Sequence, residues 1–362
     1  MAGTAKAAVF VGAGKPLEIQ EFPIPPVEPG AALISMDMAA ICGTDAHAIH
    51  LESTPHPVIF GHENIGIIAG LSSEVKEDVL GQPLKEGDRA LFRAAPCGQC
   101  KGCAMGDRCR NSLSYGFLPS DEPPYLRGGF GQYLYLDPGP WILRVPDDMS
   151  SERALLSVVG NHTALHGMEK IGGLTLSDTV VVQGSGPIGI GAMLQARMAG
   201  AERVIMIGAP ANRLELSTEM GADETIDITK MKEPEARVAR IMELTNGQGA
   251  DMVIECSGAP SAFQEGLEMV AQGGKYLVIG QWTDYGPRPI NPSIITRKGI
   301  RVEGVISARP SHIIRSLQAM HTMVKYPVEK LITHQFALED INKGFDTHES
   351  LEAMVAVIRP NQ

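Results

Sequence analysis

The pattern of apolar and polar residues divides the chain into two parts. Up to about Met149, short β-type runs such as Lys6–Val11, Ala31–Met36 and Gly66–Ala69 are separated by turns rich in glycine and proline. This punctuation predicts an irregular, β-rich domain. From about Ser151 onward, helical patterns alternate with apolar strands, which is typical of βαβ units around a parallel sheet.

The second part is regular enough to predict individual elements. The expected helices are Glu152–His166, Pro187–Ala199 and Ser311–Val324, and the expected strands are Thr179–Gln183, Arg203–Ile207, Asp251–Glu255, Tyr276–Ile279 and Arg301–Ile306. We therefore expect an α/β chain with a β-rich domain over residues 1–155 and a doubly wound parallel sheet of the Rossmann type over residues 156–300. Residues 301–362 would supply the last strand of that sheet and then return to the first domain.

Composition narrows the classes of partner. The chain has 362 residues, 44% of them hydrophobic and 20% charged, with a formal net charge of −11. These values are typical of a globular protein and argue against nucleic acid or an anionic membrane as partner. No run of about 18 apolar residues exists, and the first residues lack a charged region followed by an apolar core, so we expect a cytoplasmic protein.

A glycine-rich turn follows the strand Thr179–Gln183. Gly184, Gly186 and Gly189 have the G-x-G-x-x-G spacing, with a strand before them and a helix after them. In that context the first glycine permits a tight turn, the second lets a pyrophosphate approach the backbone, and the third lets the helix lie close to the strand. The pyrophosphate would sit at the positive end of the helix that begins with Pro187 and Ile188. The turn predicts a dinucleotide site.

The end of the next strand bears on the choice of dinucleotide. An acidic residue there would bind the ribose hydroxyls of NAD, but the strand ends in Gly208. Loss of the acid removes a repulsion toward the 2′-phosphate of NADP, yet Ala209-Pro210 supplies no cation and only Arg213 lies nearby. Arg213 could equally lie in the exposed first turn of a helix, Arg213–Met220. We expect NAD, with NADP as the alternative, and we expect Cys256, at the end of another strand, to line the cofactor cleft as a packed residue.

Four cysteines fall within thirteen residues, at positions 97, 100, 103 and 109. In a chain without a secretory signal such clustering indicates metal ligation before disulfides. Zinc takes four thiolates tetrahedrally and keeps no open position. Cys97, Cys100, Cys103 and Cys109 therefore predict a structural zinc lobe over about residues 93–112.

A second group of potential ligands lies earlier in the chain. Cys42 and His62 are twenty residues apart, and Glu63 follows the histidine directly. One thiolate and one imidazole could bind a second metal, with the carboxylate as a ligand or as support for the histidine. A lone cysteine is more often a buried small residue. The interpretation as a metal site therefore depends on the presence of the glycine-rich turn and the four-cysteine cluster in the same chain.

Together these motifs resemble those of the zinc-dependent medium-chain dehydrogenases, the group of alcohol, sorbitol and threonine dehydrogenases. The similar segments are Ile41-Cys-Gly-Thr-Asp-Ala-His, Gly61-His-Glu, Gly87-Asp-Arg, the four cysteines and Gly128-Gly-Phe-Gly-Gln-Tyr, in the order that the family has them. The resemblance covers nearly the whole chain. It implies a GroES-like first domain and a homodimer or homotetramer.

The resemblance also implies roles for the residues around Cys42. Cys42 and His62 would hold a catalytic zinc at which an alcohol transfers hydride to a nicotinamide ring, giving a ketone. Thr44 would accept the substrate proton and pass it toward His47, and Asp45 would orient the ligating histidine. Thr44 could instead be a helix-capping hydroxyl, and His47 a surface histidine.

Two features depart from the family pattern. The last two cysteines are separated by five residues instead of seven, and the position expected for the third ligand of the catalytic zinc is Val159, which cannot bind metal. The third ligand would then be Glu63 or His162, with Asn161 a poorer candidate, or the site would be weakened and partly occupied. We favour Glu63, because it requires no shift in the helix.

These observations leave three functions open. The first is a zinc-dependent dehydrogenase of a secondary alcohol, cyclic alcohols included. The segments Leu51–Pro57 and Leu113–Tyr125 suggest an apolar pocket more than one for a polyol, and Trp282 and Tyr285 would border it. The second is a metal-independent double-bond reductase or isomerase on the same scaffold. The third is a nucleotide-sensing protein without catalysis.

Overall fold

The computed structural model describes residues 3–105, 109–281, 284 and 286–362. The chain forms two compact units, one made of residues 1–155 with 332–362 and the other of residues 156–331. No helix among the described residues is long and apolar enough to cross a membrane.

The first unit is built around two sheets that are antiparallel except for the pair β15 and β16. Its strands are β1 (Thr4–Phe10), β2 (Glu18–Pro23), β3 (Ala32–Ala40), β4 (Val58–Ile59), β5 (Glu63–Leu71), β6 (Arg89–Arg93), β7 (Tyr133–Leu136), β8 (Trp141–Arg144), β15 (Ile332–Ala337) and β16 (Val355–Arg359), and its helices are α1 (Gly43–Ala48), α2 (Lys101–Ala104), α3 (Ser151–Leu156) and α11 (Ile341–Glu349). One sheet has the order β2-β1-β4, and the other the order β15-β16-β3-β5-β6-β8, with β7 also on β3. The three predicted strands of this part are confirmed as β1, β3 and β5.

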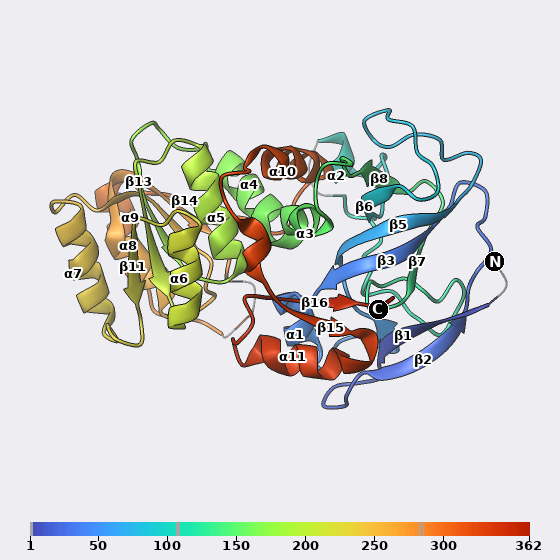
Figure 1. The fold of residues 1–362 in the computed structure, drawn as a ribbon. Helices are drawn as coiled ribbons and strands as arrows, with labels where there is room; N and C mark the ends of the chain where they lie inside the picture. Colours follow the sequence, from blue (N-terminus) through green and yellow to red (C-terminus); the bar gives the residue numbers. More distant parts are fainter. Residues whose placement is uncertain (1–2, 106–108, 282–283, 285) are drawn as a thin grey trace. The chain divides into compact units, whose positions relative to one another are not determined.

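The core of the first unit joins both ends of the chain. Phe10, Phe60 and Phe130 are fully buried in one apolar cluster with Phe345 and Ile358 from the C-terminal segment. β16 pairs with β3 through Ala39 and Ala40 and lies beside β15 in parallel. β16 is therefore internal to this sheet, and β15 forms one of its edges (Figure 1).

The second unit is a six-stranded parallel sheet with helices. Its strands are β9 (Thr179–Gln183), β10 (Arg203–Gly208), β11 (Glu224–Asp227), β12 (Ala250–Glu255), β13 (Val270–Val278) and β14 (Arg301–Gly304), and its helices are α4 (His162–Lys170), α5 (Pro187–Met198), α6 (Ala211–Glu219), α7 (Pro234–Leu244), α8 (Ala262–Met269), α9 (Ser293–Lys298) and α10 (Pro310–Thr322). Its order, β11-β10-β9-β12-β13-β14, is that of the Rossmann fold. The predicted fold class is confirmed, and the apolar runs are explained because helices cover these parallel strands (Figure 1).

The predicted helix Glu152–His166 is wrong as one continuous element. Between α3 and α4 the residues Ser157–Asn161 form a wide turn, in which Val159 has ψ 91° and Gly160 has φ 75°. A Cβ on Gly160 would lie 2.8 Å from the backbone nitrogen of Ile188, at the start of α5. The break lets the chain approach α5 closely, which the local pattern cannot reveal.

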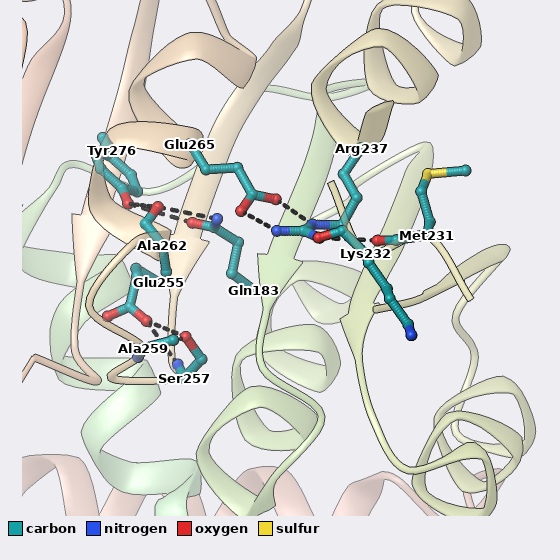
Figure 2. Close-up of polar contacts among 10 residues, drawn as sticks. All are labelled: Gln183, Met231, Lys232, Arg237, Glu255, Ser257, Ala259, Ala262, Glu265 and Tyr276. Atoms are coloured by element: carbon teal, nitrogen blue, oxygen red, sulfur yellow. Dashed lines mark hydrogen bonds and ion pairs between the residues drawn. The ribbon is translucent and has the colours of Figure 1, made fainter. Parts of the chain in front are cut away.

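Buried polar groups tie the strands of the second unit to its helices (Figure 2). Arg237 and Glu265, both almost fully buried, form a two-pronged ion pair with N–O distances of 2.7 Å that links α7 to α8. The hydroxyl of Tyr276 and the side-chain amide of Gln183 meet at the carbonyl of Ala262. These contacts satisfy groups that would otherwise be costly to bury.

Candidate metal and cofactor sites

Antiparallel pairing explains how Cys42 meets His62. Ala40, the last residue of β3, pairs with Glu63, the first residue of β5. The residues just beyond these strand ends are therefore neighbours. The backbone N–H of Ile41 donates to the carbonyl of Ala356 in β16 at 2.9 Å, which fixes the chain as it leaves β3.

Three potential ligands converge at this place. One ligand atom each of Cys42, His62 and Glu63 lies within 4.8 Å of the others. A thiolate, an imidazole and a carboxylate are a donor set that catalytic zinc accepts, leaving a fourth position for water or substrate. The residues present therefore fit a zinc ion with Glu63 as the third protein ligand.

Asp45, which is fully buried, connects the two principal ligands. Its Oδ1 lies 3.1 Å from Nδ1 of His62, and its Oδ2 accepts the backbone N–H of Cys42 at 3.1 Å. A histidine that donates from Nδ1 presents Nε2 as its lone pair, so the carboxylate selects the tautomer that can bind metal.

The charges in this cluster favour a cation. Burial and the nearby carboxylate of Glu63 raise the pKa of the Cys42 thiol. Burial opposes protonation of His62, but the charges of Asp45 and Cys42 outweigh it and hold the pKa of His62 well above its usual value. Without metal the group therefore retains protons, which a divalent ion would displace on binding.

The other residues predicted around this site are placed as follows. Thr44, half-buried, and His47, exposed, lie on the same short helix α1 as Asp45. His162 begins α4 in the second unit, whereas the converged group, made of Cys42, His62 and Glu63, lies in the first.

Val159 and Asn161 are both buried in the second unit. Val159 is buried, with 6% of its surface exposed. The amide of Asn161 accepts from Gln195 at 3.0 Å and donates to Ser316 at 2.6 Å. Both ends of this amide therefore already have partners in a buried network, which accounts for a polar residue beside the break.

The four cysteines of the predicted lobe also converge. Sγ of Cys103 lies 3.6 Å from that of Cys100 and 4.0 Å from that of Cys97, and Cys100 and Cys109 are 4.0 Å apart. Four sulfurs about 2.3 Å from a tetrahedral zinc stand about 3.8 Å from one another, so the residues fit a closed zinc site.

Backbone N–H groups support the negative charge that such a site requires. The N–H groups of Arg110 and Cys103 lower the pKa of Cys100 to about 6, and the N–H of Cys97 lowers that of Cys109. Burial, with the neighbouring sulfurs, raises the pKa of Cys103 to about 12. Metal binding would therefore have to displace the proton of Cys103.

The glycine-rich turn has the geometry that its sequence predicts. Gly184 has φ 108°, and a Cβ there would lie 2.8 Å from the backbone nitrogen of Ser257. A Cβ on Gly189 would lie 1.8 Å from the carbonyl oxygen of Gly184. Apart from chain neighbours, the only described atom within 4 Å of a Cβ on Gly186 is Nη1 of Arg213, at 3.9 Å. Backbone contacts therefore require glycine at positions 184 and 189, whereas space remains above Gly186.

This free space fits a pyrophosphate. Pro187 is the first residue of α5, followed by Ile188 and Gly189, and β9 is the strand at which the order of the sheet reverses. In doubly wound sheets ligands bind outside the carboxyl ends of the strands at this point. The residues present therefore fit a dinucleotide.

The neighbouring strand ends clarify the other predicted residues. Gly208 ends β10, and Cys256, half-buried, follows β12 with its N–H donating to the carbonyl of Gln183 at 2.7 Å. Burial and the adjacent Glu255 raise the pKa of Cys256 well above its usual value. The alternative that placed Arg213 on an exposed turn is wrong, because the residue is only 6% exposed. Trp282 and Tyr285 lie outside the described residues.

Two side chains shape this edge through hydrogen bonds that the sequence does not reveal. Ser185 is buried and donates to the carbonyl of Ala209 at 3.1 Å. Oε1 of Glu255 accepts the N–H groups of Ser257 and Gly258, both at 2.8 Å, and the Ser257 hydroxyl (Figure 2). The sequence Glu255-Cys-Ser-Gly indicates a turn after β12, because the acid can accept the N–H groups of the residues that follow it. Only the fold shows that this turn packs on Gly184.

Comparison with known proteins supports the same conclusion. Residues 28–147 match the alcohol dehydrogenase GroES-like domain, and residues 187–323 match the zinc-binding dehydrogenase family. The chain is 33% identical over 346 residues to 5-exo-hydroxycamphor dehydrogenase from Pseudomonas putida, covering 94% of this chain and 95% of that one. It is 31% identical over 355 residues to L-threonine 3-dehydrogenase from Bacillus subtilis, covering 94% of each.

A solved structure extends the likeness to the whole fold. An alcohol dehydrogenase from Thermotoga maritima superposes with a TM-score of 0.92 at 31% identity, covering 99% of this chain and 100% of that one. The resemblance stated from the motifs is confirmed. The chain belongs to the zinc-binding medium-chain alcohol dehydrogenase family.

Proposed function

We propose that the protein oxidises a secondary alcohol to a ketone with zinc and NAD, and catalyses the reverse reaction. The observation that carries the proposal is the convergence of Cys42, His62 and Glu63, with Asp45 bonded to the histidine. Zinc would act as a Lewis acid on the substrate oxygen, and the nicotinamide ring would accept the hydride.

The chain's own residues would hold the metal ion and transfer one proton. Cys42, His62 and Glu63 would bind the ion, and Asp45 would keep His62 in the required tautomer. Thr44 would accept the proton of the substrate hydroxyl at Oγ1, and His47, which is exposed on the same helix, would pass it to solvent.

An aromatic ring beside the metal ligands supports an apolar substrate. The ring of Phe117 lies 5.7 Å from that of His62 and 5.5 Å from that of Phe60, measured between centroids. The two relatives are named for hydroxycamphor and L-threonine, which both carry a hydroxyl on a secondary carbon. The aromatic neighbour favours a cyclic or other apolar alcohol over a polyol or an amino acid.

NAD is proposed as the cofactor and NADP as the alternative. The turn Gly208-Ala209-Pro210 would hold the adenosine ribose through backbone groups. Assembly into a homodimer or homotetramer is also proposed, and light scattering of the purified protein would measure it.

The test is a panel of primary, secondary and cyclic alcohols with NAD and NADP, run on protein whose zinc has been quantified. We expect two zinc ions per chain and turnover of apolar secondary alcohols. Cys42→Ala should lose one zinc and the activity while keeping the other zinc, which serves as an internal control for folding.

Two results would contradict the proposal. One is full alcohol turnover by Cys42→Ala. The other is a wild-type protein with one zinc per chain that reduces double bonds or isomerises substrates but oxidises no alcohol, because Val159 stands where the family pattern expects a ligand.

A further inference from the structure

Parallel pairing places Ser185 beside Gly208 at the carboxyl edge of the sheet. Gln183 of β9 pairs with Ile207 of β10, and the N–H of Gly184 donates to the carbonyl of Ile207 at 2.7 Å. The residues that follow the two strands therefore leave the sheet together.

The side chain of Ser185 occupies the space that a side chain at position 208 would need. A Cβ built on Gly208 would lie 2.3 Å from Oγ of Ser185, 2.6 Å from its Cβ and 2.9 Å from its backbone nitrogen. Contacts below 3.0 Å require movement, and Ser185 is only 3% exposed, with its hydroxyl bonded to the carbonyl of Ala209. No larger residue fits at position 208 while Ser185 keeps this place.

The end of the second strand is where Rossmann sheets recognise the adenosine ribose. A carboxylate there bonds the 2′-hydroxyl of NAD and repels the 2′-phosphate of NADP, whereas an arginine nearby accommodates the phosphate. In this chain Ser185 stands against the Cβ that any carboxylate at position 208 would carry, and a buried guanidinium, that of Arg213, lies over the glycine turn. Burial lowers the pKa of Arg213, but an arginine stays charged in proteins.

We propose that Ser185 determines dinucleotide specificity by excluding a carboxylate from position 208. The site then accepts both NAD and NADP, and Arg213 supplies the charge that the 2′-phosphate needs. This inference rests on the proposed function only in taking a nicotinamide dinucleotide as the cofactor.

The experiment measures binding of NAD and NADP by calorimetry, without any alcohol present. The wild-type protein should bind both within about tenfold of each other. Gly208→Asp should weaken both by about tenfold or more, because its side chain collides with Ser185. Ser185→Gly combined with Gly208→Asp removes the two closest of the three contacts and leaves only that of the backbone nitrogen at 2.9 Å. It should recover part of the NAD binding and weaken NADP binding by about 100-fold, because a carboxylate then faces the phosphate.

Smaller changes guard against variants that fail to fold. Gly208→Ala adds the colliding Cβ alone, and Ser185→Gly with Gly208→Ala should relieve its effect on binding of both dinucleotides. Arg213→Gln should weaken NADP more than NAD. Melting temperatures of every variant show whether the fold is retained.

Three results would overturn the proposal. They are wild-type exclusion of NADP by more than about 100-fold, undiminished NAD binding by Gly208→Asp or Gly208→Ala in a folded protein, and no gain when Ser185 is removed as well. Each of these can occur in a protein that binds NAD and oxidises alcohols. A folded wild-type protein that binds neither dinucleotide would overturn the proposed function too.

Discussion

The carboxylate of Asp45 contacts Nδ1 of His62 at 3.1 Å and the backbone N–H of Cys42 at 3.1 Å. One buried acid therefore sets the orientation of a histidine ligand and the start of the helix that follows the cysteine ligand. Asp45 thus contacts two members of the converged group without being a member of it.

Replacing this acid should weaken metal binding without removing a ligand. In Asp45→Asn the hydrogen bond to His62 loses its charge, and we expect the zinc affinity of the second site to fall about 10- to 100-fold. Competition with a chromophoric chelator measures this affinity, while the cysteine lobe keeps its zinc. Asp147→Asn changes an exposed acid in the same unit and serves as the control. An unchanged affinity in Asp45→Asn would contradict the assigned role.

A pair of variants identifies the third ligand. Glu63→Gln should lose the second zinc, because an amide oxygen is a poor zinc ligand, whereas His162→Gln should keep it. Zinc counts per chain by mass spectrometry distinguish the two. The opposite pattern would make His162 the third ligand and would require it to reach the ion held by Cys42 and His62.

The apolar pattern predicted those strands and turns of the second unit that depend on local sequence. The strands β9, β10 and β12 contain continuous apolar runs, and the glycine spacing at Gly184 follows the first of them directly. The strand β11, with the sequence Glu-Thr-Ile-Asp, has no such run and was not predicted. The break at Gly160 could not be predicted, because the glycine is there for contact with Ile188, twenty-eight residues later. The collision between Ser185 and position 208 likewise exists only once two strands pair in one register.

The motifs predicted which residues converge better than they predicted the third ligand of the second metal site. Cys42, His62 and the four lobe cysteines were identified by type and spacing, and they converge as expected. The choice between Glu63 and His162 depends on tertiary structure: Glu63 converges with Cys42 and His62 in the first unit, whereas His162 begins a helix in the second.

The buried ion pair between Arg237 and Glu265 should be costly to break from one side. Arg237→Met leaves a buried carboxylate without its partner, and we expect a loss of about 3–5 kcal/mol in the free energy of unfolding. Urea denaturation measures the loss. Arg237→Met with Glu265→Leu should be less destabilised than Arg237→Met alone, because no charge is then stranded. A double variant that is less stable than the single one would contradict this explanation.

His312 should make the stability of the second unit sensitive to mild acid. Burial and the charge of the neighbouring His166 lower its pKa, although the carboxylate of Glu169, 3.2 Å away, opposes this. The unfolded chain regains a pKa of about 6.5, so below that pH it binds a proton more readily than the folded chain. The free energy of unfolding should therefore decrease as the pH falls through this range.

The variant His312→Asn isolates this effect. Its side-chain oxygen can still accept the N–H of Arg309, which Nδ1 of His312 accepts at 3.1 Å. The melting temperature of the wild type should drop more between pH 7.5 and pH 5.5 than that of the variant. His334→Asn, a change in the first unit, should behave like the wild type. Equal drops in the wild type and His312→Asn would assign the acid sensitivity to other groups.

Because β16 belongs to the first unit, the second unit can finish folding before the first while the chain is being synthesised. The dinucleotide unit is one continuous segment, so it can fold as soon as residue 331 has left the ribosome. The metal ligands Cys42 and His62 are made much earlier, but Ile41, beside the first of them, is bonded to Ala356. Until β16 (Val355–Arg359) has been made, the nascent chain therefore carries the Cys42 thiol beside an unfixed Ile41 and an unpaired edge on β3, which exposes this region to wrong metals and to aggregation.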